Sequence, residues 1–67
     1  MLNAEMLRTK IDESGMKVVA ISEKSGMLRE TLYNKLKGKG EFTASEITNL
    51  SKVLNLSRQE IFDIFLS

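Results

Sequence analysis

The sequence predicts an all-α domain of short helices, and three observations lead to that expectation. Apolar residues recur at three- and four-residue spacing, the period of a helix with one buried face. Two four-residue stretches carry the complete pattern of a helix start. Residues that favour helix ends follow several of the apolar stretches. With 67 residues the chain has room for one domain, residues 1–67, folded as a compact five-helix bundle.

The first helix is expected to begin after Asn3, whose side chain can cap it, and to run to about Ser14. Leu7 and Ile11 lie four residues apart and would be buried on one face of this helix. Gly15 follows and ends it, because glycine readily adopts the left-handed conformation found after helix ends.

A second, shorter helix is expected to end near Lys24, with Ile21 and Ser22 turned inward. Residues 25–27, Ser-Gly-Met, form a three-residue turn in which the glycine supplies a positive φ. Ser22 is important because it is small: a larger side chain would hold this helix away from the next and prevent a steep crossing.

The third helix is expected from about Leu28 to Lys37, with Leu32 and Leu36 four residues apart and facing the core. Met27 would fill the corner between the second and third helices. Residues 38–40, Gly-Lys-Gly, form a flexible exit that separates the basic segment from the helices that follow.

The last two helices begin at capping boxes. In residues 43–46 and again in residues 57–60, a hydroxyl side chain precedes a glutamate by three positions, so that each can bond to a free backbone N–H of the other. We therefore expect helices to start near residues 44 and 58. The helix from about 44 to 54 would bury a stripe of Ala44, Ile47, Leu50 and Leu54. Asn55 is a suitable left-handed stop after it.

The composition argues against catalysis. The chain is 42% hydrophobic and 28% charged, which is typical of a globular protein, but it contains no histidine and no cysteine. The commonest general base and the thiolate ligands of zinc are therefore missing. We expect no enzyme activity, no metal, no cofactor and no small-molecule substrate.

Nothing in the sequence points to a membrane or to secretion. The apolar run of residues 18–21 is far shorter than the ~20 residues needed to cross a bilayer. Residues 1–5 contain an acid and no basic side chain, unlike the start of a secretory signal. We therefore expect a cytoplasmic protein.

The charges are unevenly distributed although the formal net charge is only +1. The segment from Lys17 to Lys39 carries six basic and two acidic residues, whereas the remainder carries four basic and seven acidic residues. Such a field would attract a polyanion to one side of the molecule. The alternative is a solvated helix surface on which basic residues cluster by chance.

The whole chain resembles the helix-turn-helix DNA-binding domains of the Cro/phage-repressor type, from about Leu7 to Phe65. The residues that carry the resemblance are Ile21-Ser22, Gly26-Met27, Thr31-Leu32, Lys37-Gly38-Lys39 and Leu54-Asn55-Leu56-Ser57. The resemblance implies a bundle of the lambda-repressor-like type in which the second and third helices form the motif. It further implies a phage or prophage regulator that works at the nucleoid of a bacterial or infected cell.

Three positions depart from the pattern of the family. This chain has Lys17 where the family usually has Ser or Thr, Val18 where it has Gln, and Leu28 where it has Ser. Lys17 can reach a phosphate by its charge. Val18 and Val19 either pack on the first helix or contact the ligand, and the sequence leaves both alternatives open.

In such folds the third helix lies in the major groove of DNA, with its first residues at the base edges. The resemblance thus implies base contacts by Arg29, Glu30 and Asn34, and the helical geometry adds Tyr33. Arginine can donate twice to guanine, asparagine can bridge adenine, and glutamate can accept from cytosine. Tyr33 offers its ring to a thymine methyl group or its hydroxyl to a phosphate. For Glu30 the alternative is an acid that stabilises the helix start.

Phosphate contacts, which position a protein on DNA without reading its sequence, are expected from Lys17, Thr31, Lys35, Lys37 and Lys39. Taken singly, each lysine is typical of a solvated surface residue, and only their clustering favours a ligand.

The last helix is expected to provide a dimer interface. Residues 61–66 contain five apolar side chains in six, more than one core-facing stripe can use. If Ile61, Ile64 and Phe65 fill the core, Phe62 and Leu66 remain exposed and can pair with a second copy. The alternative is a terminal helix that packs fully within a monomer.

Two functions from different classes remain. The first is a sequence-specific regulator that occupies a double-stranded DNA operator as a homodimer. The second is a protein-interaction module with the same scaffold, which binds an antirepressor- or antitoxin-like partner. Salt dependence separates the two, because a protein that neutralises phosphates loses affinity steeply as salt rises.

Overall fold

The computed structural model describes all residues, 1–67, and contains helices only. The helices are α1 (Ala4–Ser14), α2 (Val18–Ser25), α3 (Arg29–Leu36), α4 (Ala44–Val53) and α5 (Arg58–Ile61), and the last turn continues as a π-helix, η1 (Phe62–Leu66). The molecule measures 26 × 23 × 20 Å. The prediction of an all-α, five-helix globule is thereby confirmed. None of the helices has both the length and the apolar character that crossing a membrane requires.

The helix boundaries follow the local signals closely. Asn3 accepts a hydrogen bond from the backbone N–H of Met6 at 3.0 Å, and both predicted capping boxes are formed. The chain reverses after α4 at Asn55, which has a φ of 53° and is the one non-glycine residue with a positive φ. These predicted starts and stops are confirmed because each depends on groups within a few residues of one another.

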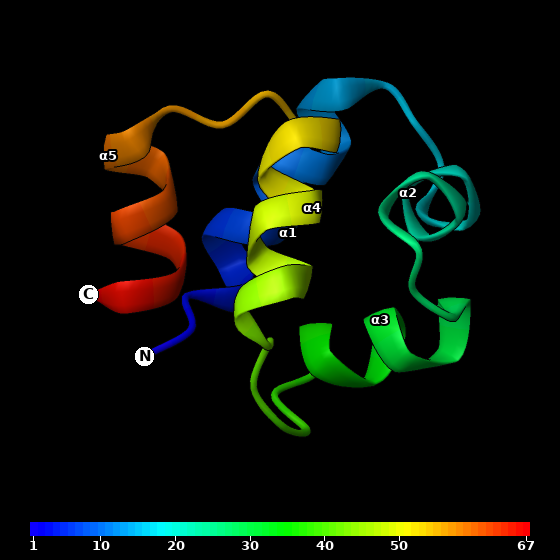
Figure 1. The fold of residues 1–67 in the computed structure, drawn as a ribbon, viewed down its shortest axis with the longest axis horizontal. Helices are drawn as coiled ribbons and strands as arrows, with labels where there is room; N and C mark the ends of the chain where they lie inside the picture. The colour runs from blue at the N-terminus through cyan, green and yellow to red at the C-terminus, as the bar shows by residue number, and fades with distance from the viewer.

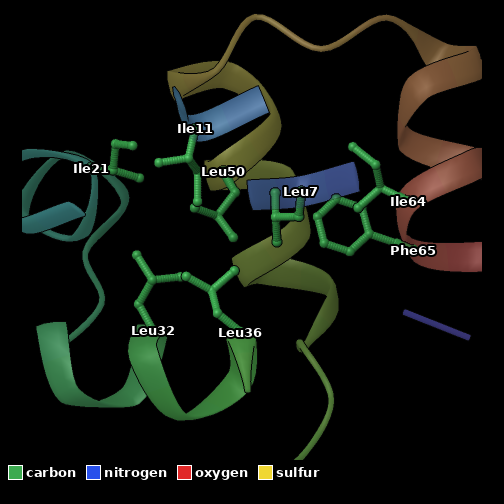
Figure 2. Close-up of a cluster of buried hydrophobic side chains, with 8 residues drawn as sticks. All are labelled: Leu7, Ile11, Ile21, Leu32, Leu36, Leu50, Ile64 and Phe65. Carbon is green, nitrogen blue, oxygen red and sulfur yellow. The ribbon is translucent and has the colours of Figure 1, made fainter. Parts of the chain in front are cut away.

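All the helices contribute to the core except the short α5, and the end of the chain closes it. Leu7, Ile21, Leu32, Leu50 and Ile64 are completely buried, and Ile11, Leu36 and Phe65 are nearly so. Figure 2 shows Leu32 and Leu36 pointing from α3 toward Leu7 and Leu50. The phenyl ring of Phe65 packs edge-on against Phe42 at a centroid distance of 5.6 Å.

Two predictions about the core were wrong or incomplete. Ala44 is exposed rather than part of the buried stripe, because it is the first residue of α4 and lies beyond the end of the core. Ile47 and Leu54 are half-buried, so that Leu50 alone is fully buried on this helix. In the last helix, Ile64 and Phe65 are buried as predicted. Phe62 and Leu66 remain 51% and 61% exposed, also as predicted.

Helices α2 and α3 meet at a turn of three residues, Gly26 to Leu28. Figure 1 shows α2 end-on and α3 lying across the view, so their axes cross steeply. The turn comes one residue later than predicted, because Ser25 remains in α2 and donates its hydroxyl to the carbonyl of Ser22. The N–H of Met27 also bonds to Ser22, at 2.9 Å, and Gly26 has the expected positive φ of 76°.

Candidate nucleic-acid interface

The candidate interface is the outward face of α3. Arg29, Glu30 and Tyr33 are exposed and Asn34 is half-buried, whereas Leu32 on the opposite side of the helix is completely buried. In Figure 1 this helix lies at the lower right of the molecule, below α2, and only the loop between α3 and α4 reaches lower. The structure therefore brings the four predicted base-contact residues together on one accessible strip.

The position of α2, and hence of the turn, is held by a contact from α4 that the sequence did not suggest and by small buried serines, of which Ser22 was predicted. The side-chain amide of Asn49 on α4 donates to the carbonyl of Ser25 at 3.2 Å. Ser22 and Ser25 are almost completely buried, and each donates its hydroxyl to a carbonyl of its own helix, as Ser22 does to Val19 at 2.8 Å. Small side chains with internally satisfied hydroxyl groups allow α2 to pack closely against α3 and α4.

The C-terminal end of α3 is also well held. The N–H of Lys39 bonds to the carbonyl of Asn34 and that of Gly38 to Lys35, both at 3.0 Å. The guanidinium of Arg8, on α1, donates to the carbonyl of Leu36. A cation at this end also interacts favourably with the helix dipole. Nothing in the spacing of Arg8 within α1 indicated this contact, since the two residues are 28 positions apart.

Lys35 differs from the other basic residues of the predicted interface. Its ammonium group lies 2.6 Å from a carboxylate oxygen of Glu46 and 5.6 Å from the centre of the Phe42 ring. Its side chain is only 16% exposed. A phosphate would therefore have to compete with Glu46 for Lys35, which here ties α3 to the start of α4.

The carboxyl group of Glu46 accepts hydrogen bonds both from the capping box at the start of α4 and from Lys35 on α3. Burial disfavours its charged form, but the hydrogen bonds from Lys35 and from the backbone N–H of Thr43 outweigh that effect, and the pKa of Glu46 lies below its usual value. The glutamate therefore stays charged and keeps both the capping box and the link to α3 in place.

The remaining lysines of the predicted interface are free. Lys17, Lys37 and Lys39 are exposed, and none of them forms an ion pair. Arg29 is likewise exposed and unpaired. Thr31, the last of the predicted phosphate contacts, is half-buried. These cations, which lie on α3 or in the segments next to α2 and α3, thus have no acidic partner to neutralise them.

A surface hollow of about 270 Å³ borders the strip where α1 and α3 meet. Tyr33 and Lys37 line it from α3, and Arg8 and Asp12 line it from α1. Val18, at the start of α2, also lines the hollow and packs against the core. Val18 thus packs against the core, as one of the two alternatives predicted, whereas Val19 remains 41% exposed.

Two apolar side chains near this surface stand out. Leu28 occupies the N-cap position of α3 without forming a cap bond and is 75% exposed, and Val19 lies on α2 with a smaller exposed fraction. The only sign of this exposed leucine in the sequence was that Leu28 stands where a helix cap usually has a polar residue.

The predicted dimer surface lies on the last helix, away from α3 (Figure 1). Phe62 and Leu66 are exposed, and Leu66 borders a hollow of about 290 Å³ that Phe42 and Phe65 also line. The backbone N–H of Asn3 donates to the carbonyl of Ile64 at 2.6 Å, which fixes this segment against the start of α1.

No three acidic side chains come close enough to hold a metal ion. Comparison with models of protein families, with curated proteins and with solved structures finds no significant match to this chain. The interpretation of the interface therefore depends on its own geometry and chemistry.

Proposed function

We propose that this chain is a sequence-specific regulator that binds double-stranded DNA and places α3 in the major groove. The resemblance to domains of the Cro/phage-repressor type suggests that it acts by occupying an operator. The observation that carries the proposal is the strip of Arg29, Glu30, Tyr33 and Asn34, which is accessible while Leu32 and Leu36 hold the back of the same helix in the core.

The chemistry of the strip suits base edges. Arg29 has no ion-pair partner, so its guanidinium is free to donate to the two acceptors of guanine. Asn34 and Glu30 offer the complementary groups for adenine and cytosine. Tyr33 lies one helical turn beyond Glu30 and can meet a thymine methyl group or the backbone.

The surrounding cations suit the phosphates. Lys17, Lys37 and Lys39 are free to bind them, and the half-buried Thr31 can add a hydroxyl. We assign Lys35 a weaker share, since it would have to leave Glu46 to reach DNA.

A single module of this size contacts few base pairs, so we propose that two copies bind symmetric half-sites about 34 Å apart. Phe62 and Leu66 would form the contact between them, because both are large, apolar and exposed. Each such side chain removed from water contributes ~1.5–3 kcal/mol.

The decisive experiment is selection of bound duplexes from a random pool by the full chain at moderate salt. An enriched motif with two-fold symmetry is expected. Affinity for that duplex should then fall steeply between 50 and 200 mM salt, by about 10³-fold if each subunit neutralises ~3 phosphates.

A protein-interaction module is the second candidate function. It is favoured by the exposure of Val19 and Leu28, which are apolar and lie on the α2–α3 side of the molecule. Under this alternative no duplex is enriched, and salt has little effect on whatever binding the chain shows to nucleic acid.

A further inference from the structure

Leu28 is an apolar side chain at the tip of the candidate recognition helix. It is 75% exposed, more than any other large apolar residue except Met1. It occupies the N-cap of α3, where a hydroxyl or carboxamide would bond to the free N–H groups of the first turn. Leu28 makes no such bond.

Folding does not account for a leucine at this position. The backbone of Leu28 is extended, with φ −71° and ψ 141°, and its carbonyl accepts the first helical bond, from Leu32, at 3.0 Å. A serine could adopt the same conformation, accept the same bond and cap the helix as well. The leucine side chain contributes neither to the core nor to the cap.

The surroundings of Leu28 indicate what it could contact. It immediately precedes Arg29 and Glu30, both exposed and charged, and it lines none of the four hollows in the surface. Leu28 is therefore a single apolar side chain beside the charged side chains that are proposed to contact bases. It does not line an apolar groove that could receive a segment of protein.

We infer that Leu28 is a further specificity-determining residue, which recognises a thymine by contact with its C5 methyl group. The inference rests on the proposed binding of α3 in the major groove. Base edges there present hydrogen-bond donors, hydrogen-bond acceptors and one apolar feature, the thymine methyl. With Arg29 and Glu30 at base edges, the side chain that precedes them lies at the same level of the groove.

The test uses the duplex selected by the full chain and replaces its thymines one at a time by deoxyuridine, which lacks only the methyl group. At one thymine of each half-site the replacement should weaken binding of the wild-type chain about fourfold, the effect of burying one methyl-sized group. For Leu28→Ser the same replacement should leave the affinity unchanged within error.

Two controls separate recognition from folding. Leu28→Ser adds a capping hydroxyl, so its Tm should rise by about 4 °C while its sensitivity to the methyl group disappears. Val19→Ala removes another exposed apolar side chain, this one on α2, and should keep the fourfold penalty.

The outcomes distinguish this inference from the proposed function. If the chain binds its selected duplex but no deoxyuridine penalty changes in Leu28→Ser, the role of Leu28 is overturned and DNA recognition by α3 stands. If the selected site contains no thymine, the role of Leu28 is likewise overturned and DNA recognition by α3 stands. If no duplex is enriched at all, the proposed function fails and the role of Leu28 fails with it.

Discussion

The two halves of this molecule begin their helices in opposite ways. In α4 and α5 the N-caps are Thr43 and Ser57, and each forms a complete capping box with the glutamate three residues later. In α2 and α3 the N-caps are Lys17 and Leu28, and neither side chain bonds to the free N–H groups. The α4–α5 half satisfies its own polar groups, whereas the α2–α3 half leaves them available.

The cations divide in the same way. The two capping glutamates also bind lysines: Glu46 pairs with Lys35 and Glu60 with Lys10. Lys17 at the start of α2, and Lys37 and Lys39 just after α3, have no acidic partner. Three cations on the α2–α3 side are thus unpaired, although the acid Glu30 lies on the strip itself, and these free cations are why we place the ligand at α3.

The largest expected effect tests whether the two halves also differ in their core. Leu32 on α3 and Leu50 on α4 are both completely buried. Truncation to alanine should cost about 2–5 kcal/mol of unfolding free energy in either case, because each leaves a cavity in the same core. Urea denaturation of Leu32→Ala and Leu50→Ala measures this. A loss below 1 kcal/mol at one site alone would show that the core is unevenly packed.

Next in size is the pairing of two copies, which we assign to the last helix. Phe62→Ser should abolish self-association, since it replaces an exposed apolar side chain worth ~1.5–3 kcal/mol at a symmetric contact. Sedimentation at tens of micromolar is the measurement, and Val19→Ala is the matched control on the other half. A wild-type chain that is already monomeric there contradicts the assignment.

A smaller effect distinguishes the two kinds of DNA contact within the α2–α3 half. Arg29→Ala should cost ~1–3 kcal/mol of affinity for the selected duplex and relax discrimination at one base pair. Lys37→Ala should weaken binding to every sequence alike and reduce the salt slope by about 1. Equal losses on selected and random duplexes for both variants would show that α3 does not read bases.

Substitutions at the N-caps of the two halves should change the free energy of unfolding in opposite directions. Thr43→Ala breaks a capping box and should cost about 1 kcal/mol of unfolding free energy. Lys17→Ser supplies the missing cap of α2 and should add ~0.5–2 kcal/mol while weakening DNA binding. Thermal unfolding and duplex affinity are measured for both variants. If Lys17→Ser lowers both quantities, Lys17 serves the fold and the contrast between the halves is lost.

The smallest expected effect is a loss of stability in acid. The pKa of Glu46 is lowered by Lys35 and Thr43 despite partial burial, and that of Glu60 is lowered mainly by its hydrogen bond with Lys10. Their contribution is therefore complete above the usual value of 4.5 and is lost as the pH falls through the lowered values. Glu46→Gln should be less stable than wild type at pH 7, and its stability should fall less between pH 5 and pH 3.

Much of the candidate site could be predicted because α3 has a simple pattern. Leu32 and Leu36 are four residues apart, so their burial determines that Glu30 and Tyr33 face outward, whereas Arg29 lies nearer the margin and is exposed at the tip of the helix. The partner of Lys35 could not be predicted in this way. Its ion pair joins α3 to the start of α4, and the spacing of residues along the chain does not predict how these two helices pack against each other.

The end of the chain shows the same limit. The capping box predicted the start of α5, but the helix is α-helical only to Ile61 and then widens into the π-helix of residues 62–66. The bond from the N–H of Asn3 to the carbonyl of Ile64 and the burial of Phe65 against Phe42 are contacts between distant segments. Neither is visible in the spacing of residues along the chain.

The amino-acid sequence by itself determined the starts of α1, α4 and α5 and the stop after α4, since caps and left-handed residues act through bonds that span no more than about five positions. It also determined which face of α3 is apolar. Only the tertiary structure decided which lysine is neutralised, which valine is covered, and that Arg8 holds the end of α3. Those outcomes depend on how helices pack against one another, and packing joins residues whose separation in the sequence carries no periodic signal.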